Sequence, residues 1–355
     1  MPSKHKGEPD LSRDEVMAAL ARVNDPELHR DIVSLGMVKT VEIEGGRVAV
    51  TLELTTPACP LKEVFTRDIR AALGKIPGFR AVAIEFTANV KPRQTQPDDI
   101  APGVKNIIAV ASGKGGVGKS TVSVGLAIAL ARAGARVGLL DADMYGPNIP
   151  LMMGIDEPPR VADNKMQPLE NYGVKVISIG FLVEPGAPVI WRGPMLNSAL
   201  RQFFSDVAWG ELDYLVVDLP PGTGDVQISL VQLVHVTGAV LVTTPQEVSL
   251  QDARRGAAMF RQTNTPLLGV IENMAYFRCD GCGKVHEIFG EGGGKRVAGE
   301  LGVPLLGRIP ISQGMREGGD SGKPLIIADP DCEQSRTVRD IASALAASVA
   351  VLNSK

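Results

Sequence analysis

Residues 113–120, Gly-Lys-Gly-Gly-Val-Gly-Lys-Ser, have the types and spacing of a phosphate-binding loop. Glycines allow the backbone to curl so that successive amide hydrogens point at phosphate oxygens, and the N-terminus of a following helix adds its positive end. Lys119 would then reach the β and γ phosphates of a nucleotide, and Ser120 would ligate Mg²⁺. The alternative is a glycine-rich turn that binds no ligand.

A second lysine, Lys114, stands one residue into this loop. It comes too early to duplicate Lys119, because its side chain leaves from the outer rim of the loop. The residues alone leave two interpretations open. Either the ammonium group is solvated, or it reaches a phosphate bound by a facing subunit and stabilises charge in the transition state, as an arginine finger does.

Three carboxylates follow apolar segments that we interpret as buried strands. Asp141 and Asp143 close the segment that starts at Val137, and Asp218 closes the segment that starts at Leu212. Residues two apart on a strand point the same way, and α/β sheets bind ligands at the carboxyl ends of their strands. We expect these carboxylates to hold Mg²⁺ or to orient water, with solvated turn acids as the alternative.

The pair Cys279 and Cys282 forms the only Cys-x-x-Cys motif of the chain. Two thiolates bind one edge of a metal site, whereas zinc or a [4Fe–4S] cluster takes four ligands. A symmetric dimer would supply two cysteines from each subunit and complete the set. The alternatives are a zinc site shared in a dimer, an intrachain zinc site completed by His286 and Cys332, and a redox pair, which the surrounding glycines disfavour.

A further cysteine, Cys59, precedes Pro60 at the expected start of a helix. At such a position the helix macrodipole lowers the pKa of a thiol, which would make Cys59 a better nucleophile or metal ligand. The alternative is a buried, inert cysteine. Four cysteines in 355 residues are too few for a disulfide framework, so metal or redox chemistry is the more informative interpretation.

The elements that must position these residues alternate along the second part of the chain. An apolar run at 106–111 precedes the phosphate loop, and a run of helical length at 121–131 follows it. Further strands are expected at 137–141, 212–218, 239–244 and 268–272. This order predicts a doubly wound, mainly parallel α/β sheet with a ligand at the carboxyl ends of its strands.

A smaller α/β domain is expected before this sheet. An amphipathic helix opens at Leu11, a hairpin is centred on Gly45 and Gly46, a second helix starts at Pro60, and a strand covers 81–90. A proline-rich polar stretch then separates two domains. The predicted division is 1–90 for the small domain, 91–105 for the linker and 106–355 for the larger domain.

Composition excludes several classes of function. The formal net charge is −3 and aromatic residues make up 4% of the chain, so a nucleic-acid surface is not expected. The chain opens without an apolar signal region and has no run of about 18 apolar residues, which predicts a soluble, cytoplasmic protein without a membrane partner.

Residues 114–120 resemble the deviant phosphate loop of the MinD, ParA, nitrogenase iron protein and Mrp/ApbC ATPases, a branch of the P-loop NTPases. The remainder resembles the Mrp/ApbC iron–sulfur carriers, and the segment with Asp25-Pro-Glu27 and Thr55 to Pro60 resembles the small MIP-type domain of iron–sulfur assembly factors. In this superfamily the early lysine, here Lys114, acts across a dimer.

The resemblance assigns roles to individual residues. Asp143 would act on the attacking water, Asn273 would pair with adenine, and 220–225 would form a switch loop. The nucleotide site would comprise Gly113, Lys114, Gly115, Gly116, Val117, Gly118, Lys119, Ser120, Thr121 and Asn273. Mg²⁺ would be held by Ser120, Asp141 and Asp218, hydrolysis would use Lys114, Lys119 and Asp143, and a cluster would sit on Cys279 and Cys282, with Cys59 as a further candidate ligand.

The resemblance therefore implies an ATPase that carries a [4Fe–4S] cluster at a homodimer interface, receives it from cluster donors and gives it to apo-proteins. A positioning switch of the MinD/ParA kind is an alternative, but it leaves the cysteines without a role, and the C-terminal helix has almost no lysine or arginine. An ATPase with a structural zinc site is another. Electron transfer is less well supported, because the relatives that perform it place their cluster ligands singly.

Overall fold

The computed structural model describes residues 11–94, 99–182 and 193–354. The chain folds as two compact units. Residues up to 91 form the first together with 350–355, and residues 92–349 form the second. Within the described part of the chain, no helix has both the length and the apolar character needed to cross a membrane.

The first unit is a three-stranded sheet in the order β3-β4-β5 with two helices. Its elements are α1 (Arg13–Leu20), β1 (Asn24–Asp25), β2 (Arg30–Asp31), β3 (Val38–Glu44), β4 (Arg47–Leu54), α2 (Lys62–Leu73) and β5 (Ala81–Ala88). A capping box of Ser12 and Glu15 starts α1, and β3 and β4 form the expected antiparallel hairpin. Alternate residues of β4 are buried, so one face of the sheet carries the core of the unit.

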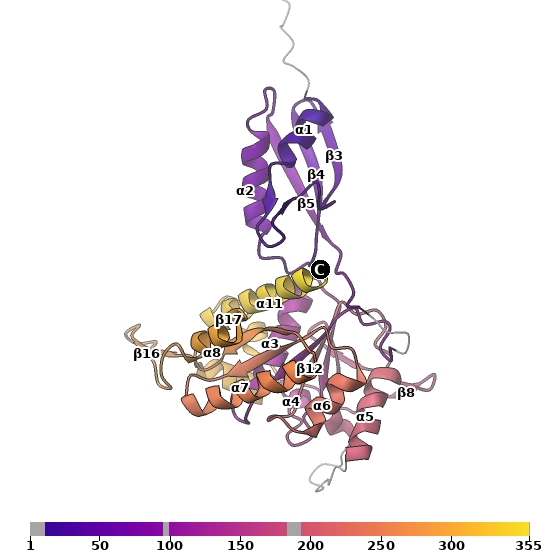
Figure 1. Cartoon of the computed structure of the whole chain (residues 1–355), viewed down its shortest axis with the longest axis vertical. Coiled ribbons are helices and arrows are strands. Elements are labelled where there is room, and N and C mark those ends of the chain that lie inside the picture. The colour runs from indigo at the N-terminus through magenta and orange to yellow at the C-terminus, as the bar shows by residue number, and fades with distance from the viewer. Residues whose placement is uncertain (1–10, 95–98, 183–192, 355) are drawn as a thin grey trace, which may run out of the picture. The chain divides into compact units, whose positions relative to one another are not determined.

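The second unit is built on an eight-stranded sheet in the order β10-β11-β7-β12-β6-β13-β14-β17, in which only β10 runs antiparallel to its neighbour (Figure 1). Its strands are β6 (Ile107–Ala111), β7 (Val137–Asp141), β10 (Leu169–Asn171), β11 (Val174–Ser178), β12 (Tyr214–Asp218), β13 (Gly238–Thr243), β14 (Leu267–Glu272) and β17 (Leu305–Arg308). Every residue of β6, β7, β12 and β13 is buried, because helices cover both faces of a parallel sheet.

Helices and two short ladders complete this unit. The helices are α3 (Lys119–Arg132), α4 (Ile149–Met152), η1 (Ile179–Leu182, a 3₁₀ turn), α5 (Gly193–Ser205), α6 (Asp225–Leu233), α7 (Glu247–Gln262), α8 (Gly293–Leu301), α9 (Gln313–Asp320), α10 (Leu325–Ala328) and α11 (Glu333–Leu352). The ladders pair β8 (Val161–Ala162) with β9 (Lys165–Met166) and β15 (Phe277–Arg278) with β16 (Val285–His286). The predicted α/β class, with a small domain before a mainly parallel sheet, is confirmed.

The stretch 91–105, expected as a linker, packs on the second unit where the structure describes it. The side chains of Arg93 and Asp99 are almost fully buried and form an ion pair of 2.6 Å. Lys105 donates its backbone N–H to Leu212 O at 2.9 Å and its ammonium group to Asp213 at 3.0 Å. The ion pair lies within the stretch, and the two bonds of Lys105 hold its end against the residues just before β12.

Candidate nucleotide and cysteine sites

The phosphate loop joins β6 to α3, as its flanking sequence predicts. Gly116 and Gly118 both have a φ of 80°, in the left-handed region that favours glycine. A Cβ atom on Gly118 would lie 2.2 Å from Asn273 Nδ2, so a larger residue cannot occupy this position without displacing the Asn273 side chain. Since α3 begins at Lys119, the positive end of a long helix adjoins the loop, as an anion site requires.

Four side chains converge at the carboxyl end of β12. Lys119 Nζ lies 2.8 Å from Asp218 Oδ2, and Ser120 Oγ donates to the same oxygen at 2.6 Å. Ser123 Oγ donates to Asp218 Oδ1 at 2.6 Å, and Asp143 Oδ2 lies 3.3 Å from Lys119 Nζ. The structure thus brings together the lysine, hydroxyl and carboxylates that the sequence indicates, and adds Ser123, which the sequence analysis missed.

Asp141 differs from these residues, although it lies on the next strand. It is fully buried, and burial raises its pKa to about 7, with the neighbouring charge of Asp218 adding to the shift. Its oxygens accept hydrogen bonds from the amides of Asp143 and Ile149 and from Ser178 Oγ, at 3.1, 3.2 and 2.9 Å. Asp141 therefore fixes the backbone of the segment that presents Asp143.

The glycine-rich loop after β12 contacts Ser112, the residue directly before the phosphate loop. Gly222 donates its N–H to Ser112 O at 2.9 Å, and Gln227 Nε2 donates to Pro220 O at 2.8 Å. Lys114 is partly exposed, its backbone oxygen accepts a hydrogen bond from Ser112 Oγ at 2.9 Å, and its ammonium group has no ion pair among the described residues. Ser112 thus bonds to both loops, through its carbonyl to Gly222 and through its hydroxyl to Lys114.

Asn273 follows β14 and closes on the phosphate loop. It is buried, and its Nδ2 donates to Val117 O at 2.8 Å. Asn273 also lines a cavity of about 600 Å³ together with Gly118, Thr121, Asn148, Leu151, Met152, Met274, Phe289, Pro310, Ile311, Ser312, Met315, Arg316, Gly319 and Asp320. This cavity adjoins the loop and falls in the size range of small-molecule sites.

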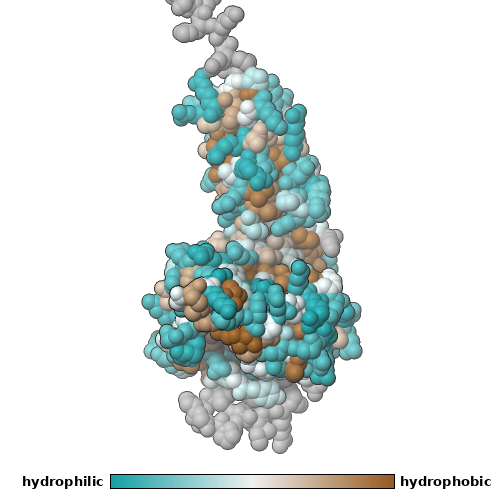
Figure 2. Space-filling model, turned by 90° about the vertical axis from the view of Figure 1, so that its left-hand side faces the viewer, coloured by the Kyte–Doolittle hydropathy of each residue, from teal (hydrophilic) through white to brown (hydrophobic). Residues whose placement is uncertain are grey.

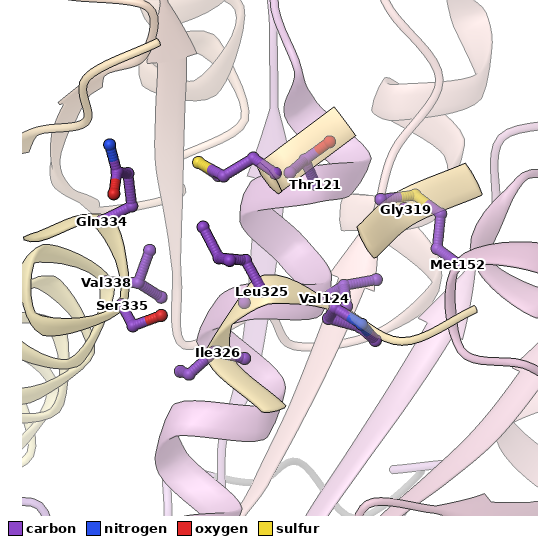
Figure 3. A pocket seen from close by; sticks show the side chains of 12 residues that line it. Thr121, Val124, Met152, Gly319, Leu325, Ile326, Gln334, Ser335 and Val338 are labelled. Atoms are coloured by element: carbon purple, nitrogen blue, oxygen red, sulfur yellow. The ribbon is translucent and has the colours of Figure 1, made fainter. Parts of the chain in front are cut away.

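Behind the loop, a smaller apolar hollow is enclosed by helices (Figure 3). Thr121 and Val124 of α3 lie opposite Leu325 and Ile326 of α10, with Val338 of α11 beside them. The hollow holds about 30 Å³, which is room for one water molecule, and its lining is almost entirely apolar. We therefore interpret it as a packing gap.

The paired cysteines lie in the turn between β15 and β16. Cys279 N donates to Lys284 O at 2.9 Å, and Gly283, at φ 71°, donates its N–H to Cys279 O at 2.8 Å. Hydrogen bonds from the amides of Cys282 and Gly281 lower the pKa of the Cys279 thiol, and a further one from the Cys282 side chain adds to the effect. The turn thus favours a thiolate, the form that binds metals.

The surroundings of this turn are open. Cys282 is exposed, and Val285 and Ile288 nearby are 39% and 56% exposed. Figure 2 views the second unit from the side on which β16 projects in Figure 1 and shows apolar residues in brown among hydrophilic ones. Among the described residues, no three His, Cys, Asp or Glu side chains gather as a metal site, so the intrachain zinc set with His286 and Cys332 does not occur there.

Of the two interpretations of Cys59, the structure favours the buried, inert thiol. Its pKa is raised to about 11, mainly because the thiol is largely buried, and the charges of Glu27 and Asp25 add to the shift. The hydrogen bond from the Leu61 amide to Cys59 Sγ, at 3.4 Å, acts in the opposite direction and is the weaker effect. Because α2 begins only at Lys62, Cys59 lies before the helix and packs against the core of the first unit.

Two protein-family models match the sequence of this chain. The family model described as ParA, the NUBPL iron-transfer P-loop NTPase, matches residues 103–346, and the model described as iron-sulfur cluster assembly protein matches residues 13–86. The chain belongs to the NUBPL iron-transfer P-loop NTPase family. The expected resemblance to iron–sulfur carriers with a small assembly-type domain is thereby confirmed.

Individual relatives of this family cover nearly the whole chain. The iron-sulfur cluster carrier protein of Deinococcus radiodurans is 52% identical over 95% of this chain and 96% of its own length. The protein of the same name from Synechocystis is 49% identical over 96% of this chain and 99% of its own length. A nucleotide-binding protein from Archaeoglobus fulgidus, solved in complex with ADP, is 38% identical, with a TM-score of 0.59 over 68% of this chain and 96% of that one.

Proposed function

We propose that this chain is an ATP-dependent carrier that holds a [4Fe–4S] cluster between two copies through Cys279 and Cys282 and transfers it to apo-proteins. The observation that carries the proposal is the cysteine turn, which is exposed and stabilises a thiolate but offers only two cysteine ligands. A second copy would supply the other two of the four that such a cluster takes. Exposure suits handover, since an acceptor must reach the cluster.

The relatives support this assignment. Two proteins named iron-sulfur cluster carrier protein align with 95% and 96% of this chain, and the solved relative from Archaeoglobus fulgidus is in complex with ADP. Partners would be a second copy, cluster donors and apo iron–sulfur proteins, and the place of action would be the cytoplasm. Asn273, on the cavity next to the loop, would contact the adenine.

The residues around Asp218 fit a magnesium nucleotide. Mg²⁺ prefers oxygen ligands and keeps several waters, and the Ser120 hydroxyl with the Asp218 carboxylate provides such donors. When bound, the ion neutralises charge on the phosphates. Lys119 would bind the β and γ phosphates, and Asp143 would orient the attacking water. Both oxygens of Asp141 already accept protein hydrogen bonds, so its part in magnesium binding would be indirect.

Lys114 would complete the hydrolytic site of the partner subunit. The substitution Lys114→Ala should retain nucleotide binding but lose most ATP hydrolysis, by a factor of about 10³ if it acts like an arginine finger. Lys119→Ala should weaken both binding and hydrolysis. Nucleotide affinity and phosphate release, measured on the same preparations, separate the two effects. Wild-type hydrolysis in Lys114→Ala would show that this side chain is only solvated.

The cluster proposal is tested by anaerobic reconstitution with iron and sulfide. The wild type should form dimers, load a cluster and donate it to an acceptor apo-enzyme. Cys279→Ala and Cys282→Ala should neither load a cluster nor donate one. Cys332→Ala and Cys59→Ala are the matched controls and should load normally. Normal loading and transfer by Cys279→Ala and Cys282→Ala would contradict the proposal, and so would a strictly monomeric cluster-loaded protein.

A further inference from the structure

The nucleotide site and the cysteine turn are joined by one short segment of chain. β14 ends at Glu272, Asn273 contacts the phosphate loop, and Cys279 follows only six residues later. This segment lies alongside the chain that follows β17, because Ala275 N donates to Ile309 O at 2.9 Å and Ile311 N donates to Tyr276 O at 2.7 Å. The stem of the cysteine hairpin is thus bonded to a wall of the nucleotide cavity.

The backbone of this segment is strained at one residue. Met274, between Asn273 and the hairpin, has a φ of 53°, in the left-handed region that non-glycine residues rarely adopt. It also lines the nucleotide cavity. Strained backbone persists only where the surrounding contacts hold it, and it is common at sites that switch. A ligand that displaces Met274 would therefore move the hairpin stem.

A buried carboxylate anchors the same segment. Glu272 is fully buried and accepts hydrogen bonds from Gly294 N at 2.6 Å and Arg308 Nε at 2.7 Å. Arg308 continues outward, with its Nη2 3.4 Å from Glu287 Oε2 and its guanidinium 5.6 Å from the centre of the Tyr276 ring. Glu287 directly follows β16, so Arg308 links the far arm of the hairpin to the end of β14.

A second set of contacts holds the near arm. Arg278 makes two hydrogen bonds to Glu333, the first residue of α11, at 3.1 and 3.2 Å. Tyr276 donates its hydroxyl to the same carboxylate at 2.9 Å. The near arm is therefore fixed to a helix, whereas the far arm is held to the sheet through Arg308.

We propose that Arg308, bridging Glu272 and Glu287, is a positioning residue that couples the nucleotide site to the cysteine turn. Nucleotide binding at Asn273 and Met274 shifts the end of β14, and the bridge passes this shift through the far arm of the hairpin to the turn that carries Cys279 and Cys282. The inference rests on the proposed function, since it describes how the two sites of the carrier communicate. It predicts that nucleotide changes the accessibility of the cysteines even in the absence of a cluster.

The burial of Glu272 and the partial exposure of Glu287 decide which end of the bridge to change. Removing Arg308 leaves the carboxylate of Glu272 buried without its cation, which is costly for folding. Glu287 is the better target, because its side chain is 31% exposed and Glu287→Gln breaks only the outer end of the bridge. Glu291→Gln is the matched control, as Glu291 is exposed in the same loop and forms no ion pair among the described residues. Arg308→Lys tests the bridge itself, since an ammonium group cannot span two carboxylates as a guanidinium does.

The experiment measures the alkylation rate of Cys279 by iodoacetamide in the full-length, cluster-free protein, with and without ADP or a non-hydrolysable ATP analogue. In the wild type and in Glu291→Gln, nucleotide should change the rate at least about fivefold, the lower end of typical allosteric coupling. In Glu287→Gln and Arg308→Lys the ratio should fall towards one while ADP affinity stays as in the wild type. Thermal unfolding of Glu287→Gln should also stay as in the wild type.

Two results would overturn the coupling. One is a nucleotide effect of wild-type size in both bridge variants, and the other is the absence of any nucleotide effect in the wild type. Because alkylation needs no cluster, these outcomes are independent of the cluster-loading test. A protein that couples its sites but loads no cluster would refute the proposed function alone, and a protein that loads a cluster without responding to nucleotide would refute the coupling alone.

Discussion

Two regions of the molecule carry a cysteine beside a turn, and their chemistry is opposite. Cys279 lies in an exposed turn where backbone amides of Cys282 and Gly281 lower its pKa. Cys59 also accepts a backbone amide, from Leu61, yet burial raises its pKa to about 11. A hydrogen-bond donor thus stabilises a thiolate only where water or further donors share the charge. The number of amides and the access to water decide the reactivity of a thiol, more than its neighbours in sequence.

The difference between the two thiols is tested most directly by measuring their alkylation rates at pH 7. At pH 7 a thiol with a pKa of about 11 is ionised to about one part in 10⁴, compared with a few parts per hundred for an ordinary cysteine. Cys279 should therefore react with iodoacetamide at least about a hundredfold faster than Cys59. Peptide mass spectrometry of the intact protein checks this. Equal rates at pH 7 would show that burial of Cys59 does not hold in solution.

A second test sharpens the role of the turn geometry. Gly283 has a φ of 71° and open space around the position of a Cβ atom, so Gly283→Ala adds backbone strain without a clash. Without metal the alanine turn relaxes out of the left-handed region, so metal binding must restore a conformation that costs about 1–2 kcal/mol, which corresponds to a loss of about tenfold in metal affinity at the cysteine turn. Gly299→Ala in α8 also meets open space, at an ordinary helical position, and serves as the control. Competition with a chelator measures the difference, and unchanged affinity in Gly283→Ala would contradict the importance of the turn.

The two cysteine regions also show which features of the molecule could be predicted from the sequence. The loop at 113–120, the cysteine pair and five of the eight strands of the large sheet (β6, β7, β12, β13 and β14) are local patterns, and their spacing was enough to predict them. The strands β10, β11 and β17 were not predicted. The sequence left two interpretations of Cys59 open, because the burial of its thiol depends on the packing of the whole first unit, which the neighbouring proline does not reveal. Ser123 and Arg308 were missed for the same reason, since their partners Asp218 and Glu272 are 95 and 36 residues away in sequence. Ser123 left one signal, a hydroxyl four residues after Lys119 within the otherwise apolar run 122–131.

The smallest expected effect concerns stability. Cys59 packs against the core of the first unit, so Cys59→Ala should lower the free energy of unfolding by about 1 kcal/mol, whereas Cys279→Ala at an exposed turn should change it by less than about 0.5 kcal/mol. The raised pKa gives this test a pH signature. Above about pH 9 the thiol ionises in the unfolded chain before it does in the folded one, so the unfolded state binds fewer protons and stability falls as pH rises towards 11. Cys59→Ala should lack this component of the loss. Denaturant titrations of the wild type and the variant at pH 8 and pH 10 check this prediction. The difference in stability between the two proteins should be smaller at pH 10. An unchanged difference would mean that the Cys59 thiol reaches water as freely as Cys279.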